Sequence, residues 1–426
     1  MSRPSLSIFF FAPLKHLLLV VALLAAFPAL AAEPIVLGLN VPRSGEYREE
    51  GLMQIRGALL AVEELNNRGG VLGRPLQLIE ADSASRPAQA VANVDSLIDQ
   101  GARMLFGGAS SAVAIAAGKR AAQRGVVYFG TLTYSNDTTG KDAHRYMFRE
   151  SYNAWMASKV LGGYLQEQLP GRSYYYVTAD YTWGHTTEAS MRRFTATEDS
   201  RQHPASLLSF PGATQSELRA ALRQAADAKP DVLVLVLFGD QMVKAMRVAH
   251  EFGLTRDSQI VVPNITLSMV EQVGPAIMEG VLAGSAWTWN LPFELGNQRG
   301  QAFVRDFAER YQSYPSTSAA SAYSIVYQWA EAVTRNGTLA SEALISALED
   351  HEYQLLKDAQ RWRGFDHQNV QSVYAVRIKP RAEVMRDPLR QDYFEIVSRL
   401  AGEQAVISHP EWLAERRAHG QPEQLR

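Results

Sequence analysis

Residues 35–73 read IVLGLNVPRSGEYREEGLMQIRGALLAVEELNNRGGVLG. The apolar run Ile35–Leu39 is typical of a buried strand. Helical spacing then puts a set of apolar residues on one face, namely Ile55, Ala58, Leu59, Val62 and Leu65. Gly69 and Gly70 end that helix. A buried strand followed by an amphipathic helix is the first unit of a parallel sheet covered by helices.

The same alternation of strand and helix continues in two successive sets. The first set adds strands at Leu76–Ile79, Met104–Phe106 and Val126–Phe129, and the second has strands at Tyr174–Thr178, Leu207–Phe210, Val232–Leu237 and Ile260–Val262. Helical segments separate them. The sequence therefore predicts an α/β fold of two Rossmann-like lobes, each with a parallel, doubly wound sheet.

The last third of the chain breaks this alternation. Three helices without matching strands are expected near Gln301–Gln312, Ser316–Arg335 and Ser341–Leu348, so the chain returns to complete a lobe already begun. A β-like pair is expected around Arg361–Phe365 and Val373–Ile378. The charged, turn-rich end, Glu411–Arg426, is predicted to be an exposed extension.

Composition narrows the class of protein. The chain has 426 residues, with 42 basic and 44 acidic side chains and 46% hydrophobic residues, which fits two folded domains. This balance excludes a disordered chain and a nucleic-acid binder driven by bulk charge. Cysteine is absent, so disulfides, thiolate metal sites and lipid attachment through cysteine are excluded.

The N-terminus has the pattern of an export signal. Arg3 and Lys15 precede the apolar run Leu17–Ala26, and Ala29 and Ala31 supply the small residues of a cleavage site. Residues 1–31 are therefore interpreted as a removed signal peptide. The alternative is a membrane anchor, which the run is too short to form, since a span requires about 20 residues.

Loops that follow the strands carry the candidate binding residues, because ligands of open α/β sheets bind beyond the carboxyl ends of the strands. The loop after Phe106 contains Gly107, Gly108, Ala109, Ser110 and Ser111, and the loop after Phe129 contains Thr131 and Thr133. Hydroxyls and helix-start N–H groups there could bind an anion such as a carboxylate. The alternative is that Ser110 or Ser111 only caps the following helix.

In the second set, two loops combine aromatic and polar residues. One contains Tyr181 and Trp183, and the other Phe238 and Asp240. The rings could close over a ligand, or they could be ordinary core residues. Motifs for phosphate binding, serine hydrolysis or zinc are absent, and His185 near Asp180 is interpreted as a polar helix start. We therefore expect no enzyme activity, cofactor or metal.

Several stretches together resemble a known family. They are Val36–Leu39 to Ser44-Gly45, Gly51 to Gly57-Ala58, Glu64–Asn66 to Gly69–Gly73, the Ala109–Ser111 loop, Tyr181–Gly184 and Phe252–Leu254. In this order and spacing they resemble periplasmic binding proteins of the leucine/isoleucine/valine-binding type. The similarity covers roughly residues 34–378.

The resemblance implies a type I periplasmic binding fold with two lobes joined by three crossovers. We expect the crossovers near Arg149–Tyr152, Ser285–Asn290 and Asp366–Gln371. The lobes would then comprise residues 32–150 with 288–367, and residues 151–287 with 368–385, followed by a C-terminal extension over 386–426.

The family's ligand contacts are carried over onto matching positions. The loops at Ala109–Ser111 and Gly130–Thr133 would hold the ligand carboxylate, Trp183 would cover the ligand, and Phe238 and Asp240 would lie on another contact loop. Branched-chain amino-acid binders carry a glutamate where this chain has Asn264, and a neutral amide cannot replace it opposite a buried cation. Either Asp240 takes that role or the ligand is not an amino acid.

The resemblance also implies a function. We expect a monomeric periplasmic receptor, without a lipid anchor, that delivers a small ligand to an ABC-type permease and its ATPase subunits, with no nucleic-acid partner. The ligand would come from the class of branched-chain amino acids, amides or aromatic acids. Trp183, Trp287 and Trp289 favour apolar or aromatic bulk, although Trp287 and Trp289 could instead pack the hinge. The alternative function is a ligand-sensing module for a separate signalling protein.

Overall fold

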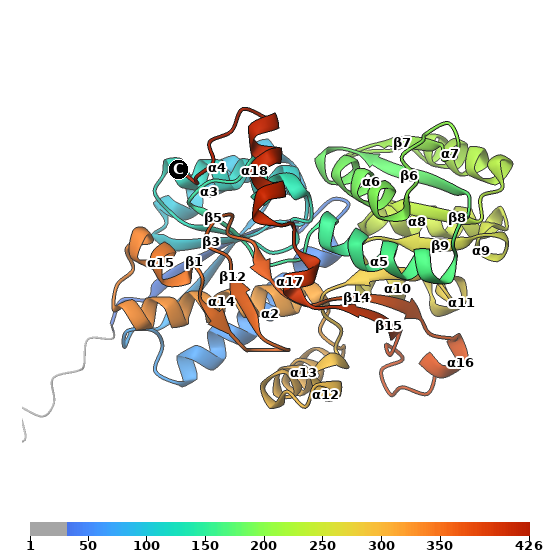
Figure 1. Cartoon of the computed structure of the whole chain (residues 1–426). Helices are drawn as coiled ribbons and strands as arrows, with labels where there is room; N and C mark the ends of the chain where they lie inside the picture. The colour runs from blue at the N-terminus through green and yellow to red at the C-terminus, as the bar shows by residue number, and fades with distance from the viewer. Residues whose placement is uncertain (1–31) are drawn as a thin grey trace, which may run out of the picture. The chain divides into compact units, whose positions relative to one another are not determined.

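The computed structural model describes residues 32–426, so the predicted signal peptide at 1–31 lies outside the described residues. Two larger sheets and one smaller sheet organise this part of the chain (Figure 1). Each larger sheet carries helices on both faces, which confirms the predicted α/β class with two lobes. Within residues 32–426, no helix is long and apolar enough to cross a membrane.

The first sheet is entirely parallel. Its order is β2-β1-β3-β4-β5, with bounds Leu76–Asp82, Ile35–Val41, Ala102–Gly107, Tyr128–Gly130 and Met147–Arg149. Helices α3 (Pro87–Asp99) and α4 (Ser111–Gln123) pack together against one face, and α2 (Arg48–Asn67) packs with α14 (Thr317–Asn336) against the other. Because α2 packs against both the sheet and α14, its buried surface extends beyond the predicted stripe to Met53, Gln54 and Leu60.

The second sheet has seven strands in the order β15-β14-β10-β9-β8-β6-β7. Their bounds in that order are Phe394–Leu400, Val373–Ile378, Leu282–Ser285, Gln259–Val262, Val232–Val236, Tyr174–Asp180 and Ala205–Ser209. The last five strands are parallel, whereas β14 is antiparallel to β10 and β15. The prediction of a purely parallel sheet is therefore wrong at this edge, where the chain returns from the first lobe.

The helices of the second lobe also divide between the two faces. Helices α5 (Ala154–Gln168) and α6 (Thr182–Thr195) pack against each other, as do α7 (Gln215–Ala228), α8 (Gly239–Glu251) and α10 (Leu267–Val273) in succession. The short elements are η1 (Asn136–Thr139), α9 (Leu254–Asp257), α11 (Pro275–Met278), α12 (Leu291–Glu294), α16 (Arg381–Val384) and α17 (Gly402–Ala405). Helices α13 (Gln298–Tyr311) and α15 (Ser341–Leu348) confirm the predicted return of the chain to the first lobe, where α15 packs on α14.

A third sheet of three short strands corrects one prediction. Strands β11 (Glu352–Tyr353), β12 (Gln360–Trp362) and β13 (Asn369–Val370) form an antiparallel sheet. The predicted β-like pair is wrong because β12 lies in this small sheet, while β14 belongs to the second large sheet. The chain thus passes between the large sheets three times: after β5, after β10 and before β14.

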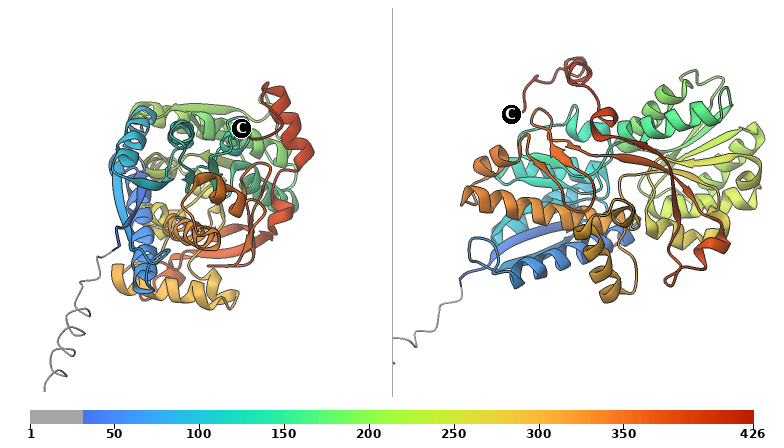
Figure 2. Two further views of the ribbon diagram at one scale, coloured as in Figure 1. Left: turned by 90° about the vertical axis from the view of Figure 1, so that its left-hand side faces the viewer. Right: turned by 60° about the horizontal axis from the view of Figure 1, so that its bottom comes forward.

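The C-terminal segment is not an exposed extension. Strand β15 pairs with β14, and helix α18 (His409–Ala418) lies on the first lobe, as Figure 2 shows. Trp412 is only 1% exposed, and its Nε1 donates to Thr139 O at 2.7 Å. Arg416 donates to Gly140 O at 2.6 Å. The charges of this segment suggested exposure, but the Trp412 ring and these two backbone acceptors fix the helix.

Candidate ligand site between the lobes

Aromatic side chains from both lobes meet where the parallel strands end. The aromatic cluster consists of Tyr47, Tyr134, Tyr152, Tyr181, Trp183, Phe210 and Phe238. The Phe238 ring lies 5.3 Å from Tyr47 and 5.7 Å from Tyr134, both of the first lobe, and 6.1 Å from Trp183 of its own lobe. Such edge-to-face pairs stabilise the contact beyond simple apolar burial. The cluster therefore joins the lobes.

The lobes touch closely beside this cluster. The Tyr47 and Tyr181 hydroxyl oxygens are 3.0 Å apart, and the Asp240 N–H donates to Glu46 O at 3.1 Å. Gly239 has φ +57°, and a Cβ added there would lie 2.6 Å from Glu46 O. Only glycine fits this combination of backbone conformation and contact. The two lobes are therefore in direct contact at this junction.

The predicted serines of the first lobe lie at the start of α4. Ala109, Ser110 and Ser111 are all buried. Ser110 occupies the N-cap position but makes no capping hydrogen bond, and its Oγ has no partner among the described residues. Ser111 Oγ accepts from the Ser135 N–H at 3.0 Å. The alternative that one of these serines caps the helix is wrong.

Other polar groups predicted in the first lobe are already used within it. Thr131 Oγ1 donates to Gln54 Oε1 at 2.6 Å, and Thr133 Oγ1 lies 2.7 Å from Thr138 Oγ1. Gly107 has φ +131°, and a Cβ there would lie 2.4 Å from Asn40 O. This glycine is therefore required for close packing of neighbouring strands rather than for the approach of a ligand.

In the second lobe, Trp183 and Asn264 form a buried pair. Trp183 is 1% exposed, and its Nε1 donates to Asn264 Oδ1 at 3.2 Å. Asn264 is fully buried, and its Nδ2 makes no hydrogen bond of good geometry among residues 32–426. Its amide interacts with the Tyr152 hydroxyl, where it opposes the rise in the Tyr152 pKa that burial causes. Tyr181 stacks on Phe210 with ring centroids 4.1 Å apart. Asp240 is only partly buried and contacts the first lobe through its backbone.

Three buried donors around the cluster share one property. Ser110 Oγ, Tyr134 OH and Asn264 Nδ2 have no hydrogen-bond partner within the described part of the chain. Burial raises the pKa of Tyr134 well above its ordinary value, so its hydroxyl keeps its proton and remains a donor. A buried unpaired polar group costs about 1–3 kcal/mol. Each of these three donors is therefore stabilised by any acceptor that reaches it.

Four aromatic members of the cluster were not predicted from the sequence: Tyr47, Tyr134, Tyr152 and Phe210. Tyr47 follows β1 and Tyr152 follows β5, and both are almost fully buried. The rule that ligands bind beyond strand ends also applies to the loop after β1, so it could have found Tyr47. The same rule applies to Tyr152 after β5, which contacts Tyr134 at 4.9 Å between ring centroids and donates to Gly284 O at 2.9 Å.

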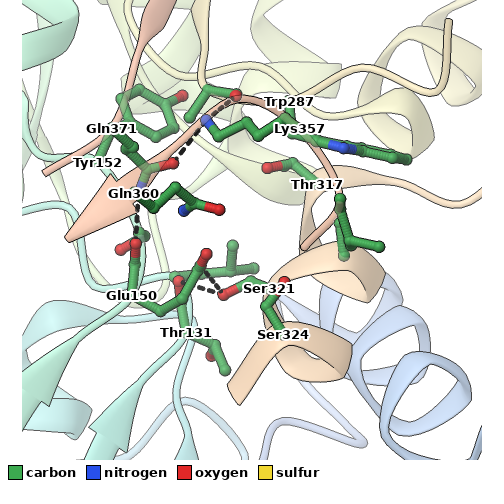
Figure 3. A pocket seen from close by; sticks show the side chains of 15 residues that line it. Thr131, Glu150, Tyr152, Trp287, Thr317, Ser321, Ser324, Lys357, Gln360 and Gln371 are labelled. Atoms are coloured by element: carbon green, nitrogen blue, oxygen red, sulfur yellow. Dashed lines mark hydrogen bonds between the residues drawn. The ribbon is translucent and has the colours of Figure 1, made fainter. Parts of the chain in front are cut away.

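A small polar cavity lies beside the crossovers (Figure 3). Its volume is about 20 Å³, room for about one water molecule, and its lining includes Glu150, Trp287, Lys357 and Gln371. Lys357 Nζ donates to Ala286 O at 2.6 Å and to Gln371 Oε1 at 2.8 Å, which ties two crossovers together. Burial lowers the pKa of Lys357 to about 8. The cavity lies at the crossovers and is too small for an organic ligand.

The remaining candidate side chains have other roles. Trp289 stacks on Tyr314 at 3.8 Å, and Trp287 packs on Phe303 at 5.9 Å, so both rings pack near the second crossover. His185 pairs with Asp180 at 2.8 Å on the surface. No group of three or more His, Cys, Asp or Glu side chains suited to a metal ion occurs among the described residues.

Comparison with known proteins identifies the family to which this fold belongs. Residues 34–383 match the family described as periplasmic binding protein. The chain belongs to this family. That assignment confirms the resemblance to leucine/isoleucine/valine-binding proteins, since a Leu/Ile/Val-binding protein homolog 4 of Brucella abortus is 29% identical over 173 residues. That alignment covers 39% of this chain and 42% of the Brucella protein.

Solved structures resemble the periplasmic binding protein over most of its length. An amino acid ABC transporter substrate-binding protein from Pseudomonas fluorescens is 26% identical, with a TM-score of 0.75, covering 87% of this chain and 96% of its own. A solute binding protein of an ABC transporter from Rhodopseudomonas palustris, solved with 3,4-dihydroxy benzoic acid, has a TM-score of 0.75 at 17% identity. It covers 87% of this chain and 98% of its own.

Proposed function

We propose that this periplasmic binding protein is a receptor that captures a small carboxylate-bearing ligand between its lobes. The observation that carries the proposal is the set of buried donors Ser110, Tyr134 and Asn264, which come from both lobes. Tyr134 belongs to the aromatic cluster, and Asn264 adjoins it through Trp183. A ligand with acceptors at both ends would pair these donors once the rings move apart to admit it. The proposed chemistry is binding, in keeping with the periplasmic binding protein family.

The donor set also favours one class of ligand. On the second lobe, Asn264 offers an amide N–H, whereas the ammonium group of an amino acid needs an acceptor, best a carboxylate. Asp240 is only partly buried and contacts the first lobe through its backbone N–H. It is therefore a poor substitute for a carboxylate that would bind the ammonium group. We infer an aromatic or apolar acid whose far end carries a hydroxyl or carbonyl oxygen. A protein of the same fold, the solute binding protein from Rhodopseudomonas palustris, was solved in complex with an aromatic acid of this kind, 3,4-dihydroxy benzoic acid.

The mechanism follows from the contacts between lobes. A ligand bound to the first lobe gains contacts with Trp183, Phe238 and Asn264 only when the second lobe closes, so it shifts the equilibrium towards the closed form. We propose that the closed form, in the periplasm after removal of residues 1–31, is recognised by a membrane permease with its ATPase subunits. The receptor would act as a monomer.

A thermal-shift screen tests the ligand class. Benzoate and hydroxybenzoates should raise the melting temperature of the purified protein, whereas leucine, isoleucine and valine at the same concentration should not. A ligand that binds only the folded state stabilises it by about 2.7 kcal/mol at 100 times its dissociation constant. Stabilisation by branched-chain amino acids instead would contradict the assigned role of Asn264.

Replacing Ser110 by alanine should weaken binding of the best acid from that screen by roughly 1.5–3 kcal/mol, about tenfold to a few-hundredfold. The hydroxyl makes no capping bond, so the stability of the free protein should change little. Isothermal titration calorimetry measures the affinity, and Ser216→Ala on the exposed face of α7 serves as the matched control. Equal affinities of the Ser110 and Ser216 variants would remove Ser110 from the site.

A further inference from the structure

Glu50 is a buried acidic residue that joins the lobes. It lies in the first turn of α2 and is only 1% exposed. Its carboxylate accepts hydrogen bonds from Thr266 Oγ1 at 2.7 Å and Ser268 Oγ at 3.0 Å, both at the start of α10 in the second lobe. It also accepts one from Ser318 Oγ of α14 in the first lobe. One carboxyl group thus holds hydroxyls from both lobes.

No positive charge compensates this carboxylate. Across residues 32–426, no Lys, Arg or His forms an ion pair with Glu50, and α10 and α14 present only hydroxyls to it. The charged neighbour of Glu50 is Glu49 on the same helix. The charge of Glu50 also raises the pKa of Tyr134, which lies in the loop after β4. Burying an uncompensated carboxylate is costly, so such a group is stabilised in its protonated form.

The surroundings of Glu50 also change its pKa. Burial raises it above its ordinary value, although the three hydroxyl donors oppose the shift. The bonds to Thr266 and Ser268 connect the two lobes, so they exist only while the lobes are closed. In an open clamp, water would reach the carboxyl group, and its pKa would return towards about 4.3.

We propose that closure of the two lobes is coupled to the uptake of one proton by Glu50. The population of the closed form relative to the open form therefore increases as the pH falls. The proposal rests on the opening and closing that the proposed function requires. A proton bound more tightly by one form shifts the equilibrium towards that form. The shift operates from the raised pKa of the closed form down to about 4.3, and below that value both forms carry the proton.

The size of the effect has an upper bound. Within this pH window, one proton changes the equilibrium constant between open and closed forms by at most about tenfold per pH unit. The same factor would enter the affinity for any ligand that requires closure. Ligand capture would therefore respond to acidity without any titratable group on the ligand.

The absence of cysteine makes the movement directly measurable. One cysteine introduced at Ala88 on α3 and one at Ser216 on α7, both exposed, place a fluorophore pair across the lobes. Single-molecule energy transfer without ligand, from pH 8 to pH 5, then counts the molecules at the separation found in this structure. The closed fraction should rise as the pH falls.

Two variants separate the role of Glu50 from general acid effects. Glu50→Gln copies the neutral carboxyl group and should keep a high closed fraction at every pH, with the pH dependence lost. Glu49→Gln, one residue away on the same helix and partly exposed, should behave like the parent. If Glu50→Gln fails to fold, Ser268→Ala replaces it. The loss of this hydroxyl donor raises the pKa of Glu50 further and should move the rise in closed fraction to higher pH, and an unmoved rise would overturn the coupling.

The outcomes distinguish the two proposals. A closed fraction that does not change with pH, or an unaltered pH dependence in Glu50→Gln, would overturn proton coupling. Addition of benzoate at pH 8 then tests the clamp itself: closure by benzoate without any pH response leaves the receptor proposal standing and rejects the coupling. A rise in the closed fraction at low pH that only Glu50→Gln abolishes supports the coupling, whatever the ligand is.

Discussion

Replacing Trp183 by alanine should weaken binding of the acid that stabilises the protein most by about 3 kcal/mol, roughly 150-fold. The ring is buried at the junction of the lobes, within 6.1 Å of the Phe238 ring and 5.9 Å of the Tyr181 ring. Its Nε1 also positions the Asn264 side chain, which would lose a donor. The variant removes both the Trp183 ring from the candidate site and the Nε1 donor that orients the Asn264 side chain.

Calorimetric titration of the variant measures this loss, and Trp412→Ala provides the control. Trp412 is equally buried but packs α18 on the first lobe, away from the aromatic cluster. Its removal should lower the free energy of unfolding by about 3–5 kcal/mol and leave the affinity unchanged. If Trp183→Ala binds as tightly as the parent, Trp183 is a core residue, as the alternative interpretation of the sequence had it.

Local signals along the chain were sufficient to predict most of the fold. The run from Ile35 and the later strands show the expected alternation, because strands buried on both faces need continuous apolar residues. The antiparallel edge was not predictable, because β14 carries the same apolar pattern as a parallel strand. Its direction is set by the path of the chain through the first lobe, which no local pattern encodes.

Part of the aromatic cluster was predicted from the sequence, because a position just after a strand is a local signal. Trp183, Phe238 and Asn264 lie together because they follow β6, β8 and β9, parallel strands of one sheet whose carboxyl ends meet at the same edge. Thr131 and Thr133 also follow a strand, but neighbours in their own lobe use their hydroxyls. In the sequence, Glu50 is one of several charged residues at the start of a helix. It could not be predicted to be buried, because its burial depends on contacts in the tertiary structure.

Arg149→Met should lower the free energy of unfolding by about 3–5 kcal/mol, through the loss of a buried charged network. Arg149 is fully buried at the end of β5, and burial lowers its pKa to about 9. Its guanidinium donates to Gln368 Oε1 at 2.6 Å, to Thr133 O at 3.2 Å, and to Ser135 O and Thr139 Oγ1. Methionine fills similar space but leaves these acceptors unpaired.

The variant should also weaken ligand binding, because the network holds the loop that carries Tyr134. Thr133 and Ser135, on either side of Tyr134, both offer carbonyls to Arg149, and Gln368 lies in the third crossover. Urea denaturation and calorimetric titration measure the two effects, with exposed Arg103→Met as the control. Lost stability with unchanged affinity would mean that other contacts position Tyr134. Losses in both would show that one buried arginine couples a crossover to the ligand site.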